Sequence, residues 1–290
     1  FSKNKINIKF LGEKNKKKFF SLSIPKLDIF LDINFEPNST IEYQSGELKF
    51  DLLKTILLIN FNGNDSFSIK DSFVRNKFLN SKINGNIQFK NNFYFNLNFD
   101  INKVALRKLL YYYFAPSLNS QPIISNISKK INGKIKIFNK SSNSFLGKIN
   151  NSTAIIIFEN GDVKINDATA NLPFGSKIDY QIEYSDIGGY QSIKFSFKFS
   201  STDPAKFFRK FDIYDFSEKD ISILANGFID INNNKIKFKE IIKNNNERLG
   251  KKTLSDIEKS FNEVVINNTA LDIFDFFKIK RFAKEITYSE

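Results

Sequence analysis

The segment Phe93-Tyr94-Phe95-Asn96-Leu97-Asn98-Phe99-Asp100-Ile101 decides the fold of this chain. Its apolar residues occupy every second position, and mostly polar residues stand between them. Because side chains of a β-strand alternate between the two faces of a sheet, this period predicts a strand with one apolar and one polar face. The spacing then changes over residues 102–110, which predicts a short helix with Asn102 as its N-cap.

A similar unit follows about one hundred residues later. Residues 193–200, with the sequence IKFSFKFS, alternate in the same way. Asp203 is a favourable N-cap and Pro204 suits the first position of a helix, so a second short helix is expected after this strand. The two units, approximately residues 81–114 and 181–216, predict an internal repeat.

A shorter pattern, Asn-Gly-x-Ile, opens residues 84–87, 132–135 and 226–229. Looser copies surround Gly46 and Gly161. Glycine at the beginning of a strand permits a bend or a bulge, and we expect such bends at most of these copies. The pair Asn160-Gly161 is instead typical of a simple hairpin turn.

Alternating segments continue to residue 242 and predict a β-rich domain over residues 1–242. A polar linker and a helical segment are expected over residues 243–290. Within that segment, Ser255 and Glu258 match a capping box, and Thr269 can cap a last helix.

Composition argues against an enzyme. The 290 residues include 34 Phe but no His, Cys, Met or Trp. The commonest acid–base groups, nucleophiles and metal ligands are therefore missing, and no glycine-rich phosphate loop occurs. The carboxylate pairs Asp162/Asp167 and Asp212/Asp215 are predicted to be surface residues. We expect no catalytic residue, no metal and no cofactor.

The formal net charge is +13, but the lysines are scattered over the predicted polar faces. No helix carries a basic stripe, so nucleic acid is not an expected partner. No run approaches the length of a membrane-spanning helix. The lack of any Met predicts that the chain is a fragment or a processed form.

Long strands with one apolar face must bury that face. Either two layers close on each other in a sandwich or barrel, or an open, curved sheet is covered by a ligand. Phenylalanine suits a groove for acyl chains because it needs no hydrogen-bond partner. Each buried methylene contributes about 0.8 kcal/mol, so part of a chain suffices for strong binding.

The order of these motifs resembles the C-terminal part of AsmA-like proteins, a group that includes TamB and YhdP. The resemblance rests on hairpins opening with Asn-Gly-x-Ile, the long alternating strands, the capped helix, and the ending ALDIFDFFKIKRFAKEI at residues 270–286. It implies a mainly β fold, an elongated and curved antiparallel sheet that forms an apolar groove. It also implies a periplasmic protein of a Gram-negative bacterium, anchored in the inner membrane by a segment not present here. The implied activity is phospholipid transport between the inner and outer membranes.

The residues expected to bind lipid are Phe89, Phe95, Leu97, Phe99, Phe195, Phe197, Phe199, Ile229 and Ile231. The expected partners are phospholipid acyl chains, the membrane and outer-membrane assembly proteins. Two other functions remain open: a non-enzymatic assembly or structural factor that acts through protein contacts, and an adhesin or glycan-binding sandwich.

Overall fold

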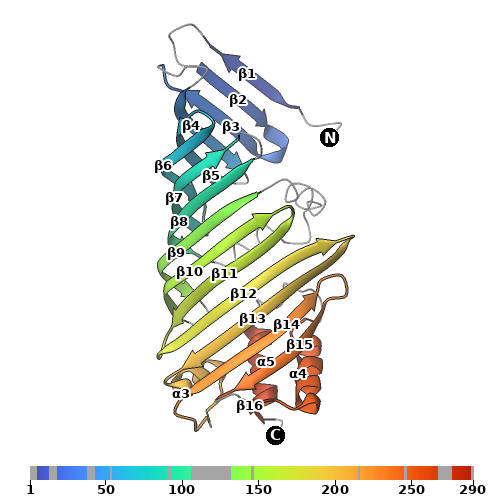
Figure 1. Cartoon of the computed structure of the whole chain (residues 1–290). Helices are drawn as coiled ribbons and strands as arrows, with labels where there is room; N and C mark the ends of the chain where they lie inside the picture. Colours follow the sequence, from blue (N-terminus) through green and yellow to red (C-terminus); the bar gives the residue numbers. More distant parts are fainter. Residues whose placement is uncertain are drawn as a thin grey trace.

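A computed structural model describes residues 5–12, 18–37, 43–52, 54–89, 93–105, 132–144, 147–214, 216–244, 247–266 and 276–288. Sixteen strands form one open sheet in which the spatial order equals the chain order. Figure 1 shows this sheet as a long, twisted ribbon with β1 at one end and β16 at the other. The expected mainly β, elongated sheet is confirmed, and it is an open sheet rather than a sandwich.

The first eight strands are β1 (Asn7–Leu11), β2 (Lys18–Ile24), β3 (Ile29–Phe35), β4 (Gln44–Leu52), β5 (Thr55–Gly63), β6 (Ser66–Arg75), β7 (Leu79–Gln88) and β8 (Tyr94–Val104). The next eight are β9 (Asn132–Ser144), β10 (Gly147–Glu159), β11 (Asp162–Leu172), β12 (Ser176–Ile187), β13 (Tyr190–Ser201), β14 (Ile221–Asp230), β15 (Lys235–Lys243) and β16 (Glu247–Arg248). The described helices are η1 (Pro25–Leu27), α3 (Pro204–Phe208), η2 (Arg209–Phe211), α4 (Lys251–Val264) and α5 (Phe276–Tyr288).

Neighbouring strands in the described part of the chain are antiparallel except for one pair. β8 and β9 run parallel, with Phe95 opposite Gly133 and Phe99 opposite Ile137. A parallel pair requires the chain to return to the same end of the sheet between the two strands. The intervening residues 106–131 lie outside the described residues, and so does most of the first predicted helix.

The start of that helix is wrongly predicted. Asn102, Lys103 and Val104 belong to β8, where Lys103 pairs with Asn80 and Val104 with Leu79. Pairing with a neighbouring strand thus outweighs the local helical spacing.

The second predicted helix is confirmed as α3. The side chain of Asp203 accepts a hydrogen bond from the backbone N–H of Lys206, 3.3 Å away, and Pro204 is the first helical residue. The capping box at Ser255 is wrong, because α4 begins at Lys251 with Gly250 as its N-cap. Glu258 instead accepts a hydrogen bond from the backbone N–H of Phe238 in β15.

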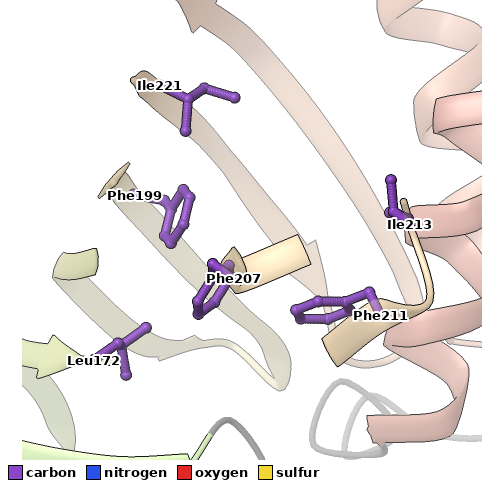
Figure 2. Close-up of a cluster of buried hydrophobic side chains, with 6 residues drawn as sticks. All are labelled: Leu172, Phe199, Phe207, Phe211, Ile213 and Ile221. Atoms are coloured by element: carbon purple, nitrogen blue, oxygen red, sulfur yellow. The ribbon is translucent and has the colours of Figure 1, made fainter. Parts of the chain in front are cut away.

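Two hydrophobic clusters hold α3, η2, α4 and α5 against one face of the C-terminal strands. The first, shown in Figure 2, brings α3 and η2 onto β11, β13 and β14 through Leu172, Phe199, Phe207, Phe211, Ile213 and Ile221. The second joins β14 and β15 to the end of α4 through Ile229, Ile236, Val265 and Ile266, with Phe261 and Phe282 packed beside them. Phe277 on α5 is exposed. Thr269, Leu271 and Phe274 lie outside the described residues.

Helix α5 is held to η2 by charge. The ammonium nitrogens of Lys280 and Lys284 lie 2.6 and 3.2 Å from one carboxylate oxygen of Asp212. Their hydrogen bonds, that of Lys280 foremost, lower the pKa of Asp212 from its ordinary value. A carboxylate whose pKa is lower in the folded state stabilises the fold above its unfolded-state pKa, and this contribution is lost as the pH falls through the lowered value.

We therefore expect Asp212→Asn to unfold at lower denaturant concentration than the unchanged protein at pH 7. The difference between the denaturant concentrations at which the two proteins unfold should narrow as the pH falls below about 4, near the ordinary pKa of Asp. Asparagine tolerates the left-handed backbone of this residue, whose φ is 57°, so the substitution tests the charge and not the backbone. Denaturation curves at pH 7, 5 and 3.5 measure the effect, and a gap that stays constant would contradict it.

Candidate functional site

One face of the sheet carries an unbroken row of apolar residues and glycines. Residues directly opposite each other in neighbouring strands share a face, so the row can be followed from β3 to β15. We call it the central row, and the face that bears it the apolar face. Its members are Phe35, Gly46, Phe61, Ile69, Gly85, Leu97, Ile135, Ile156, Ile165, Ile182, Phe195, Gly227 and Phe238.

The glycines of the row let large side chains meet across a strand. Phe35 and Phe61 flank Gly46, and Phe195 and Phe238 flank Gly227. The two ring pairs have centroid distances of 5.9 and 6.0 Å, although strands two positions apart are separated by about 9.5 Å. The rings therefore lean toward each other over the glycine between them.

A third pair, Phe95 and Phe158, meets over Gly133 with a centroid distance of 5.7 Å. A Cβ atom at Gly133 would lie 2.4 Å from the carbonyl oxygen of Phe95 and 2.6 Å from its ring. No side chain fits at this position, so the recurrent glycines mark places where rings cover the backbone.

The expected strand-entry bends are thus only partly correct. Gly133 stands at the beginning of β9, but Gly85 and Gly227 lie well inside β7 and β14. Gly85 and Gly133 have φ angles of 148° and 157°, which few other residues adopt. Asn160 and Gly161 form the expected tight turn between β10 and β11, both with positive φ.

Aromatic rings also line one end of the strands. Successive centroids lie 5.4 to 6.0 Å apart from Phe35 on β3 to Phe158 on β10. The members of this aromatic row are Phe35, Phe61, Phe67, Phe89, Phe93, Phe95 and Phe158. Edge-on and tilted ring pairs at such distances add about 0.5–1.5 kcal/mol each beyond burial. The aromatic row thus forms one margin of the apolar face.

The structure brings most of the predicted lipid-binding residues to the apolar face. Phe95, Leu97 and Phe99 on β8 alternate onto it, as do Phe195, Phe197 and Phe199 on β13 and Ile229 on β14. Phe89 lies in the β7–β8 connection and is 60% exposed, while Ile231 follows the end of β14.

The predicted residues on β8 and those on β13 and β14 differ in what covers them. Phe195, Phe199 and Ile229 pack in or against the two clusters beneath the protein's own helices, so they form internal core. Phe197 lies between these clusters and keeps 36% of its surface exposed. The strands β1–β9 make their main element contacts with neighbouring strands, and no described helix packs on them to a comparable extent.

The opposite face is polar and charged. Glu183 lies between Lys164 and Lys194 across β11, β12 and β13, at 3.7 and 4.0 Å, and Lys177 pairs with Asp179 at 2.8 Å. A shallow hollow of about 410 Å³ lies over β8–β10, lined by residues that include Asp100, Lys136, Phe138 and Ile155. Within the described ranges, no group of three or more acidic residues could hold a metal ion.

The carboxylate pairs considered from the sequence do not form a site. Asp162 begins β11, whereas Asp167 lies further along that strand with a φ of 49°. Asp212 is engaged by two lysines, and Asp215 is outside the described residues.

Sequence reasoning missed the parallel pair and the function of the glycines. The signal for the function of the glycines is their pairing: each of Gly46, Gly133 and Gly227 is opposite a phenylalanine on both neighbouring strands. That signal becomes visible only once the register of the strands is known.

No helix in the described ranges is long and apolar enough to cross a membrane. Comparisons with protein-family models, curated proteins and solved structures give no match for this chain. The resemblance to AsmA-like proteins therefore remains a prediction from the sequence.

Proposed function

We propose that this chain holds the acyl chains of phospholipids on its apolar face and contributes to their transfer between membranes. The observation that carries the proposal is the central row, which keeps apolar side chains on one face from β3 to β15. Helices α3, η2, α4 and α5 pack on its C-terminal part. Elsewhere on this face Ile69, Ile83 and Phe95 are buried, whereas Leu48, Ile59 and Leu97 are half-buried. A row that runs through so many strands suits a long, flexible hydrocarbon better than a compact ligand. No catalytic group is needed, because the acyl chains only move from contact with water to contact with an apolar surface.

The proposed mechanism is passive. Acyl chains lie along phenylalanine and aliphatic side chains, while the headgroup stays in water beside the sheet. The resemblance to AsmA-like proteins extends the proposal to a periplasmic, membrane-anchored protein that serves traffic between the inner and outer membranes. The helices that pack on the two C-terminal clusters then mark the end of the lipid-binding part of the apolar face.

Two adjacent residues of β5 provide a matched test. Ile59 faces the apolar side, opposite Leu48, whereas Leu58 faces the polar side, opposite Lys49. Both side chains are half-buried. Ile59→Asp should reduce bound phospholipid at least tenfold, because a carboxylate on the lipid-binding surface must lose its water. Leu58→Asp introduces the same charge on the other face and should leave lipid binding within about twofold.

Lipid extraction and native mass spectrometry of the purified proteins measure the bound lipid, and circular dichroism checks that both variants are folded. Unchanged protein that carries no phospholipid after exposure to phospholipid vesicles would refute the proposal. Equal loss in the two variants would also count against it.

A second candidate function rests on the edge strand β1. Ile8 and Phe10 on its apolar side are 63% and 67% exposed, and among the described strands β1 pairs with β2 alone. An exposed edge can accept an added strand from a protein partner, which favours an assembly or structural factor. A stoichiometric protein partner that binds through β1, with no lipid on the apolar face, would support this second function.

A further inference from the structure

The two margins of the apolar face carry opposite charge. Odd- and even-numbered strands run in opposite directions up to β8, so alternate connections lie at opposite ends of the strands. One margin contains the aromatic row and the β3–β4, β5–β6, β7–β8 and β10–β11 connections. The other contains the β4–β5 and β6–β7 connections, the end of β8 and the beginning of β10.

We define each margin by the connections and the last two residues of each strand, from β3 to β10. The described charges at the aromatic margin that do not face the polar side are the acidic residues Glu36 and Asp65. At the other margin, Asp51, Arg75 and Lys103 belong to one row of opposed residues on the polar face. The remaining described charges there, which we call the basic rim, are Lys54, Lys77 and Lys148.

The basic groups of this rim are available to an external anion. All three are exposed. Among the described residues they make no ion pair, whereas Lys164 and Lys194 on the polar face are paired with Glu183 of the strand between them, and Lys177 is paired with Asp179 of its own strand. Lys77 lies over the ring of Phe78, at 5.9 Å from the ring centroid, and this contact does not neutralise its charge. Arg75 lies over the ring of Phe73, which is opposite Leu58 and therefore on the polar face.

Resting on the proposed function, we propose that the lipid is anionic and that it lies in one orientation. Its phosphate is held at the basic rim, and its acyl chains extend over the aliphatic part of the apolar face toward the aromatic row. The acidic residues at the aromatic margin repel a headgroup in the reverse orientation.

The dimensions fit this arrangement. A strand of ten residues, such as β6 or β7, spans about 33 Å. One leaflet of a bilayer contributes about half of a 30 Å hydrocarbon core, so acyl chains reach about 15 Å from the headgroup region. A phosphate at the rim thus places its chains over half-buried residues such as Leu48, Ile59 and Leu97, with the aromatic row beyond the chain ends.

The test compares dioleoyl phosphatidylglycerol, which is anionic, with dioleoyl phosphatidylcholine, which is zwitterionic. The two lipids share their acyl chains, so only the headgroup differs. Retention by the purified protein is measured by extraction after incubation with vesicles of each lipid. Each lysine near an anionic lipid contributes about 1 kcal/mol, which is about fivefold, so two rim lysines beside one headgroup suffice for the preference of at least tenfold for phosphatidylglycerol that we expect of the unchanged protein.

A rim variant then replaces Lys54, Lys77 and Lys148 with Gln. Its matched control replaces Lys70, Lys82 and Lys136, three exposed lysines of the polar face, with Gln. Both variants lose the same charge, and their thermal unfolding is compared to confirm that both fold. The rim variant should bind the two lipids within twofold of each other, whereas the control should keep the tenfold preference.

Equal binding of both lipids by the unchanged protein would overturn the inference while leaving the proposed function intact. The inference would also be overturned if both variants lost the preference for phosphatidylglycerol equally. The net charge of the protein, and not the position of the lysines at the rim, would then determine the preference. Failure to retain either lipid would instead refute the proposed function.

Discussion

Replacing Gly85 with alanine is expected to lower the free energy of unfolding by about 3 kcal/mol or more. Gly85 belongs to the central row, between Ile69 and Leu97. A Cβ atom there would lie 2.1 Å from the carbonyl oxygen of Asn96 and 2.9 Å from the Cα of Leu97, and both contacts are with backbone that cannot turn aside. The φ of 148° adds the strain that a side chain suffers in this region, about 1–3 kcal/mol.

Gly188 provides the control for the backbone strain. Its φ is also positive, at 62°, but a Cβ atom there would meet nothing within 4 Å. Gly188→Ala should therefore cost only about 1 kcal/mol, the cost of a left-handed conformation for alanine. Urea denaturation of the two variants measures the difference. If Gly85→Ala were no more destabilising than Gly188→Ala, the close approach of β8 to Gly85 would be refuted.

The second large effect is expected at Phe207 of α3. Its side chain is 4% exposed and lies 4.9 Å from the ring of Phe199 and 5.7 Å from that of Phe211, measured between centroids (Figure 2). Phe207→Ala leaves a cavity in the middle of the cluster, and such truncations cost about 3–5 kcal/mol. We expect α3 and η2 to separate from the sheet first, because this cluster is their main attachment.

Phe10 on β1 is the matched control, since the same truncation removes a ring that is 67% exposed. Phe10→Ala should change the free energy of unfolding by less than about 1 kcal/mol. Denaturation curves of both variants, followed by limited proteolysis around residue 210, measure the two effects. Similar destabilisation of the two proteins would contradict the assignment of the cluster as the core.

The sequence allowed the fold class to be predicted because one physical signal dominates it. Alternation in residues 93–101 and 193–200 reports which side chains share a face, and this holds whether the sheet is open or closed. The cap of α3 was also predictable, since Asp203 and Pro204 act within a single turn. Both signals depend on residues close together in the chain.

Features that depend on distant residues could not be predicted. The extension of β8 through Val104 depends on its pairing with Leu79, and the parallel pair depends on the path of the chain between β8 and β9. Likewise, Phe195 has the same alternation as Phe95, yet it packs against a cluster that includes Val265 and Phe282, much later in the chain. The pattern therefore reported the face correctly, but it could not report which part of that face remains uncovered.

The position of the acyl chain tests the central claim most directly. A phospholipid with a photoactivatable diazirine in its acyl chain is bound to the purified protein, irradiated, and its attachment sites are identified residue by residue by mass spectrometry. Neighbouring residues on opposite faces serve as internal controls: Leu48 and Lys49, Leu97 and Asn98, Ile135 and Lys136. We predict attachment to the first member of each pair. Attachment mainly to the second members would contradict it.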